Sequence, residues 1–236
     1  MKIVFIADAH LKGLDDPNQK TIVEFLDSLR AIDKLVVLGD LFDFWTGYNR
    51  VVERNYRPTL DALVRLKKRG ASIVYIEGNH DFSMGRFFTD TLKAEVCPDS
   101  AVLDLNGKKY YLSHGDTVRM TAGYRLWRSF LRSPLFAVTA AVVRPAGVWK
   151  VALYLSERSR GHHNREASRH NATEKSLREF AAKKISEGVD GVIMGHSHSS
   201  GVHSLSGGVY ANPGSLIDGE YLVWEDGRFR VERRRT

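Results

Sequence analysis

The pattern of hydrophobic and polar positions predicts alternating strands and helices through the first half of the chain. Short apolar runs rich in β-branched residues predict buried strands over residues 3–7, 35–38 and 72–76. Segments with helical periodicity follow these strands and predict helices over residues 18–31, 56–69 and 84–93. This alternation is typical of an α/β fold built around parallel strands.

The second half shows a different pattern. A strand is expected over 109–113, no convincing strand follows within 119–172, and the next strand is expected over 191–194. Antiparallel strands are then predicted over 201–205, 208–211, 220–224 and 228–233, with Asp226-Gly227 as a hairpin turn between the last two. We therefore expect one domain, residues 1–236, with residues 119–172 inserted into it.

The insertion combines large apolar side chains with interleaved arginines. Its longest uncharged run, Ser133 to Val143, has 11 residues, whereas a helix needs about 20 to span a bilayer. We predict two or three short amphipathic helices that form a cap. Two interpretations stay open: the cap completes the core, or it lies over a site, where it accepts an acyl chain or touches an anionic membrane.

Polar motifs follow the predicted strands: DAH, GDLFD, GNHD, SHGD and GHSH. They contain seven potential metal ligands, namely Asp8, His10, Asp40, Asn79, His114, His196 and His198. Side chains at strand ends can converge on one point. A mixture of oxygen and imidazole ligands suits Mn, Fe, Zn or Co better than Ca or Mg. Because seven ligands are too many for one tetrahedral ion, we predict two divalent ions that share a carboxylate.

These motifs resemble the signature blocks of the calcineurin-like metallophosphoesterases, from Asp8 to about Ser215. The resemblance implies an α/β fold, a four-layer αββα sandwich of mixed sheets with a helical cap. It also implies the distribution of the ligands: Asp8, His10 and His198 on one ion, Asn79, His114 and His196 on the other, and Asp40 as the bridge. The implied reaction is attack by a bridging hydroxide on a phosphodiester or pyrophosphate bond.

Two further residues have catalytic roles in this interpretation. His80 would act as an acid near the leaving group, and Asp81 or a backbone carbonyl would fix its tautomer. Asp81 could equally cap the turn that follows it.

The cap, with GDLFDFW and HGDT…GYRLWR, resembles the lipid A branch of this family, the UDP-2,3-diacylglucosamine diphosphatases. The resemblance implies an acylated UDP-sugar as substrate and manganese as the usual metal. It implies substrate contacts from Asn79, Tyr124, Arg125, Asn164, Arg165 and Arg169.

Charge and cysteine content limit the partners. The net charge of +7 favours a phosphate-containing substrate and peripheral contact with an anionic membrane. The basic residues alternate with large aliphatic ones, so nucleic acid is not expected as a partner.

Cys97 is the single cysteine, which excludes an intramolecular disulfide. The apolar start is too short for a signal peptide and runs directly into Asp8, so we expect a cytoplasmic protein. The pattern does not predict an oligomeric state.

Two other functions are weighed against this prediction. A metallophosphoesterase could act on a soluble phosphodiester, a nucleotide or a phosphoprotein, and the ligand motifs would look the same. A non-catalytic scaffold with this fold would normally lack some ligands, whereas all seven are present. The exact substrate therefore stays open.

Overall fold

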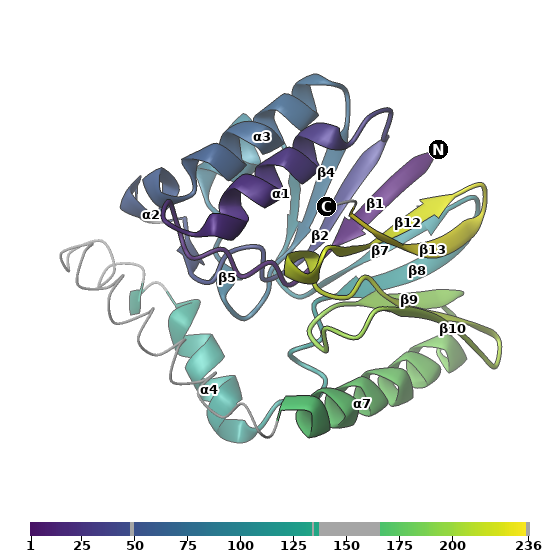
Figure 1. The fold of residues 1–236 in the computed structure, drawn as a ribbon. Coiled ribbons are helices and arrows are strands. Elements are labelled where there is room, and N and C mark those ends of the chain that lie inside the picture. Colours follow the sequence, from purple (N-terminus) through teal and green to yellow (C-terminus); the bar gives the residue numbers. More distant parts are fainter. Residues whose placement is uncertain (48–49, 134, 137–165, 235–236) are drawn as a thin grey trace.

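The computed structural model describes residues 1–47, 50–133, 135–136 and 166–234, which form two mixed β-sheets stacked face to face with helices on both outer faces (Figure 1). The first sheet contains, in spatial order, β13 (Arg228–Arg233), β12 (Glu220–Glu225), β1 (Lys2–Ile6), β2 (Lys34–Leu38), β4 (Ser72–Ile76) and β6 (Glu95–Cys97). The second contains β10 (Gly201–Leu205), β11 (Gly208–Asn212), β9 (Gly191–Met194), β8 (Lys108–Ser113) and β7 (Ser100–Leu105).

The helices complete four layers. In Figure 1, α1 (Pro17–Ser28) and α3 (Arg57–Lys68) cover the first sheet, and α7 (Glu166–Ser186) covers the second. The shorter helices are α2 (Arg50–Asn55) and α4 (Ala122–Leu131), with a π-helical turn at Phe87–Thr91 and a 3-10 turn at Leu216–Asp218. The predicted α/β fold with an αββα sandwich of mixed sheets is confirmed.

Strands that are buried on both faces explain the continuous apolar runs. In β1, Val4 and Ile6 belong to the core under α1 and α3, while Ile3 and Phe5 belong to the core between the sheets. Fully apolar strands are typical of parallel sheets with both faces covered. β1, β2 and β4 pair in parallel in the first sheet, and β8 and β9 do so in the second.

Several element boundaries differ from the sequence prediction. The helix expected over 18–31 ends at Ser28, because Leu29 adopts an extended conformation. The helix expected over 56–69 begins at Arg57, with Pro58 in its first turn, after the separate α2. The helix expected over 84–93 is only the turn Phe87–Thr91. Four strands were not predicted: β3 (Trp45–Thr46), β5 (Asp81–Phe82), β6 and β7.

The predicted insertion is described at its two ends only, because residues 137–165 lie outside the described ranges. Its start contains α4, and its predicted end at residue 172 falls inside the continuous helix α7. None of the helices in the described part of the chain has both the length and the apolar character that crossing a bilayer requires.

Candidate metal centre

The predicted ligands all lie where strands end. Asp8 and His10 follow β1, Asp40 follows β2, and Asn79 follows β4 in the first sheet. His114 follows β8, and the His196–His198 loop follows β9 in the second sheet. Both sheets thus present the carboxyl ends of their parallel strands at one edge of the sandwich, where the side chains meet.

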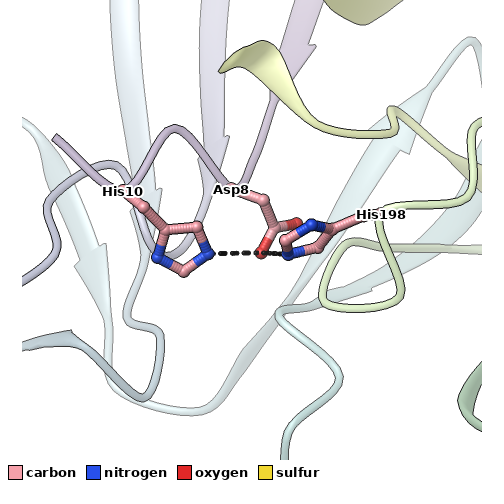
Figure 2. A group of neighbouring side chains, drawn as sticks. All are labelled: Asp8, His10 and His198. Atoms are coloured by element: carbon pink, nitrogen blue, oxygen red, sulfur yellow. Dashed lines mark ion pairs between the residues drawn. The ribbon is translucent and has the colours of Figure 1, made fainter. Parts of the chain in front are cut away.

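Asp8, His10 and His198 form the first group of neighbouring side chains (Figure 2). Oδ1 of Asp8 lies 3.3 Å from Nε2 of His198 and 3.7 Å from Nε2 of His10. In Figure 2 both imidazoles direct a nitrogen at this one carboxylate oxygen. Three ligand atoms therefore converge on a small volume.

The second group consists of Asn79, His114 and His196. Nε2 of His114 lies 3.1 Å from Oδ1 of Asn79 and 3.1 Å from Nδ1 of His196. Nδ1 of His114 lies 2.7 Å from the carbonyl oxygen of Leu38, which orients the ring so that Nε2 faces the other two residues.

Asp40 lies between the two groups. Its Oδ2 is 3.4 Å from Nε2 of His114 and 3.9 Å from Nε2 of His10. Its Oδ1 accepts a hydrogen bond from the backbone N–H of His80 at 2.9 Å. The structure thus brings the seven side chains together around Asp40, and Asp8, Asp40 and His114 also have ligand atoms within 4.8 Å of one another. The division into two groups of three, joined by Asp40, stays what the resemblance implies.

The backbone at these positions is unusual. Five of the seven candidate ligands have positive φ: Asp8 (53°), His10 (43°), Asp40 (54°), His196 (68°) and His198 (56°). Non-glycine residues occupy this region at an energetic cost, and such residues cluster at functional sites. The strain indicates that the surrounding structure holds these five side chains in place.

Two glycines allow the loops to approach each other. A Cβ on Gly195 would lie 2.7 Å from Cβ of Ala7 and 2.9 Å from Oδ2 of Asp8. A Cβ on Gly78 would overlap the carboxylate of Asp40. Side chains at these positions would therefore push the ligand loops apart.

Burial and mutual charge set the protonation of the centre. Burial opposes the charge of Asp40, but the imidazoles of His114 and His80 outweigh it and hold the pKa of the carboxyl well below 3.8. Burial lowers the pKa of His10 and of His196 to about 4, so both imidazoles are neutral at pH 7. Burial acts in the same direction on His114, but the Asp40 carboxylate prevails and raises its pKa well above 6.5.

The donor set fits divalent metal ions. Oδ1 of Asp8 and Nδ1 of His10 are buried and make no well-aligned hydrogen bond within the described part of the chain. Buried polar atoms normally have a partner. Neutral imidazoles, carboxylates and one amide oxygen are ligands for Mn, Fe, Zn or Co. Protonated His114 would release its proton when a metal binds.

His80 and Asp81 have different surroundings. Nδ1 of His80 lies 2.9 Å from the carbonyl oxygen of Asp43 and 3.8 Å from Oδ1 of the same residue. Of the two partners considered from the sequence, a backbone carbonyl fills this role. The Asp81 carboxylate instead accepts hydrogen bonds from the backbone N–H groups of Asp40 and Gly78 and from the hydroxyl of Tyr75. The expectation that Asp81 orients His80 is therefore corrected.

Asp43 was missed as a residue of the centre. Its buried carboxylate lies 3.8 Å from His80 and 3.9 Å from Nδ1 of His10, so it faces the ring nitrogens of both residues. The second aspartate of GDLFD was the available signal, because only two residues separate Asp43 from Asp40 in one loop.

The predicted substrate-binding residues are only partly brought together. Asn79 lies in the centre, and the hydroxyl of Tyr124 donates to Oδ2 of Asp116 at 2.8 Å. Arg125 is exposed on α4. Asn164 and Arg165 lie outside the described residues, and Arg169 lies in α7 without a described side chain.

Two arginines of α4 and its C-terminal end, also missed, attach this segment to the ligand loops. Nη2 of Arg132 donates to the carbonyl oxygen of Gly78 at 3.1 Å, and its Nη1 lies 3.0 Å from Oε2 of Glu77. Arg128 pairs with Asp99, and its Nε lies 3.5 Å from Oδ2 of Asp116. The segment therefore touches the residue before Asn79 and a residue close to His114.

The comparisons with known proteins point to one family. The family model described as calcineurin-like phosphoesterase matches residues 1–200. A protein named UDP-2,3-diacylglucosamine hydrolase from Aeromonas salmonicida (strain A449) is 30% identical over 255 residues, covering 99% of this chain and 94% of that protein. The protein of the same name from Serratia proteamaculans (strain 568) is 29% identical over 211 residues, 87% of this chain and 85% of that protein.

Among solved structures, a novel archaeal phosphodiesterase superposes with a TM-score of 0.51 at 14% identity and covers 99% of this chain and 100% of that one. At this identity the similarity shows the shared fold alone.

Proposed function

The chain belongs to the calcineurin-like phosphoesterase family, and from this premise we propose that it hydrolyses the pyrophosphate bond of an acylated UDP-sugar with the help of two divalent metal ions. The observation that supports this most strongly is the convergence of seven candidate ligands, from both sheets, into two groups joined by Asp40. A single tetrahedral site would not need this arrangement.

Each group would hold one ion: Asp8, His10 and His198 the first, Asn79, His114 and His196 the second, with Asp40 between them. When bound, such ions supply Lewis acidity that polarises a phosphoryl oxygen and acidifies the attacking water. We propose manganese for this role, with Fe, Zn and Co as alternatives that the same donor set accepts.

His80 would assist the leaving group. A carbonyl oxygen only accepts hydrogen bonds, so the contact with the carbonyl of Asp43 indicates a hydrogen on Nδ1 of His80. Nε2 then faces the departing oxygen, and it would donate a proton to that oxygen when the ring carries a hydrogen on both nitrogens, returning to the neutral form with Nδ1–H. The His80 ring packs edge-on against His10 with centroids 5.0 Å apart, which places it beside the first ligand group.

The substrate class is supported by the relatives and by α4. Relatives covering most of this chain are named UDP-2,3-diacylglucosamine hydrolases. Large apolar side chains on and just after α4 are exposed within the described structure: Leu126, Trp127, Phe130 and Leu135. This segment also touches the loops that carry Asn79 and His114, so it could place acyl chains beside the centre. Action in the cytoplasm, at the surface of an anionic membrane, belongs to the same proposal.

The test compares two substrates with Mn²⁺: UDP-2,3-diacylglucosamine and bis-p-nitrophenyl phosphate. We expect metal-dependent release of UMP from the first, with loss of activity in EDTA and in Asp40→Ala. If only the small diester is cleaved, the protein is a phosphoesterase, but the acylated UDP-sugar is not its substrate. No hydrolysis of either, with Mn²⁺ bound, would reject the proposed reaction.

A further inference from the structure

A second buried polar network lies behind the loop that carries His196 and His198. The side chain of Ser197, between the two histidines, donates to Oε2 of Glu174 on α7 at 2.6 Å. The hydroxyl of Tyr210 donates to the same oxygen at 3.0 Å. Nδ2 of Asn212 donates to Oγ of Ser197 at 2.9 Å and to the carbonyl oxygen of Gly195 at 3.1 Å. Glu174 is 8% exposed, and the side chains it serves are fully buried.

The direction of these hydrogen bonds gives Glu174 a specific role. The amide of Asn212 donates to the hydroxyl of Ser197, and that hydroxyl must then donate its own hydrogen elsewhere. Tyr210 likewise needs an acceptor. An ionised carboxylate only accepts, so Glu174 receives both hydroxyl hydrogens. Without it two buried hydroxyls would lose their acceptor, which is costly in a low-dielectric interior.

The loop needs support because its backbone is strained. His196 and His198 both have positive φ, on either side of Ser197. Such conformations persist only where the surroundings impose them. On the side of the metal centre, the backbone N–H of His196 donates to Oδ2 of Asp8 at 2.9 Å. On the opposite side, Glu174 holds Ser197. The loop is therefore fixed from two directions.

We propose that Glu174 is a positioning residue that keeps this loop in its metal-binding conformation and so sets the affinity of both ions together. His196 belongs to one ligand group and His198 to the other, so a single displacement of the loop would disturb both. This inference rests on the proposed function, because it takes the two histidines as ligands. It also means that α7, the helix after the undescribed segment, contacts the centre's supporting residues directly.

The experiment measures Mn²⁺ binding to the full chain, by calorimetry and by electron paramagnetic resonance of the bound ions. Glu174→Ala is compared with Glu174→Gln and with Glu179→Ala, a matched control at an exposed glutamate of the same helix. Loss of a residue that orients metal ligands costs roughly 10–100-fold in metal affinity. We expect a loss of that size for both ions in Glu174→Ala, together with a changed resonance spectrum, and wild-type binding in the control.

Glu174→Gln should recover most of the affinity, because an amide oxygen can still accept from Ser197 and Tyr210. Its NH₂ group would face Arg178, which now pairs with the other carboxylate oxygen at 2.9 Å but is exposed and can move away. Recovery by glutamine would separate the acceptor role from a general need for negative charge.

Two results would overturn different claims. If wild type binds two Mn²⁺ ions and folded Glu174→Ala binds them equally well with an unchanged spectrum, the role of Glu174 is wrong. If wild type itself binds no metal, the proposed function fails. Should Glu174→Ala not fold, Ser197→Ala, which removes one hydroxyl, decides the matter: weakened binding supports the inference, and unchanged binding rejects it.

Discussion

Oδ1 of Asp81 accepts a hydrogen bond from the backbone N–H of Asp40 at 2.9 Å. The link is reciprocated one residue earlier, where the backbone N–H of His80 donates to Oδ1 of Asp40. The loop after β4 and the loop after β2 are thus tied together at the residue that joins the two ligand groups. Asp81 is fully buried, and its carboxylate accepts from the backbone N–H groups of Asp40 and Gly78.

Asp81→Asn should therefore weaken metal binding. One position of the asparagine amide would present N–H groups to backbone N–H donors, which leaves buried donors without an acceptor. We expect Mn²⁺ affinity to fall by roughly 10–100-fold, measured by calorimetry on folded protein. Unchanged affinity with reduced turnover would instead return Asp81 to a role in catalysis.

His80→Ala should reduce turnover and leave metal binding unchanged, in contrast to Asp81→Asn. The His80 ring lies within ligand reach of His10 and Asp40, but the proposed distribution gives it no metal. Both ions should therefore stay bound while turnover falls by roughly 10²–10⁴-fold, as expected for loss of a general acid. Parallel measurement of kcat and of Mn²⁺ stoichiometry separates the two effects. Wild-type turnover with metal bound would exclude His80 as the acid.

Arg132 and Glu77 should act as a coupled pair. The Arg132–Glu77 ion pair is largely buried, so Arg132→Met or Glu77→Gln should each lower the free energy of unfolding by about 1–3 kcal/mol, the cost of an unpaired buried polar group. The double variant should lose less than the sum of the two. Chemical denaturation of all four proteins checks this, and additive losses would show that the residues do not interact.

Arg132→Met should also change substrate preference. Loss of its bond to the carbonyl of Gly78 detaches α4 from the loop that carries Asn79. The KM for UDP-2,3-diacylglucosamine should then rise more than the KM for bis-p-nitrophenyl phosphate. Equal changes for both substrates would argue that α4 supports the centre without contacting acyl chains.

The interaction of Asp27 on α1 with Arg65 on α3 should make the free energy of unfolding depend slightly on pH. Arg65 on α3 donates two hydrogen bonds to this carboxylate, which lower the pKa of Asp27 below 3.8. A lowered folded-state pKa means that the stabilisation is present above about pH 4 and is lost as the pH falls through the folded-state value. Because both groups are well exposed, Asp27→Asn should cost at most about 1 kcal/mol near neutral pH. Urea unfolding of both proteins should show this difference shrinking at about pH 3, and a difference that grows with acid would contradict it.

The parts of the fold that could be predicted from the sequence are those set by local pattern. β1, β2, β4 and β9 are apolar on both faces, and a ligand motif follows each of them. The same stretch of sequence therefore predicts the strand and the candidate ligands at its end. The two-residue strands β3 and β5 carry too few positions to show a period. The edge strand β6 is only three residues long and begins with the exposed Glu95, so it is also too short to show a period.

The supporting residues of the centre could not be predicted, because they depend on contacts between distant segments. Glu174 reaches Ser197 across 23 residues, and Arg132 reaches Gly78 across 54. Each looks like an ordinary charged residue on a helical segment until the packing of that segment is known. Asp43 lay inside a recognised motif, but only the fold reveals that it faces both His10 and His80.

Whether two metal ions share Asp40 can be seen by anomalous X-ray scattering from crystals grown with Mn²⁺. We predict two peaks, one contacted by Asp8, His10 and His198, the other by Asn79, His114 and His196, with a carboxylate oxygen of Asp40 touching both. A single peak, or two peaks of which one lies away from Asp40, would contradict the dinuclear centre.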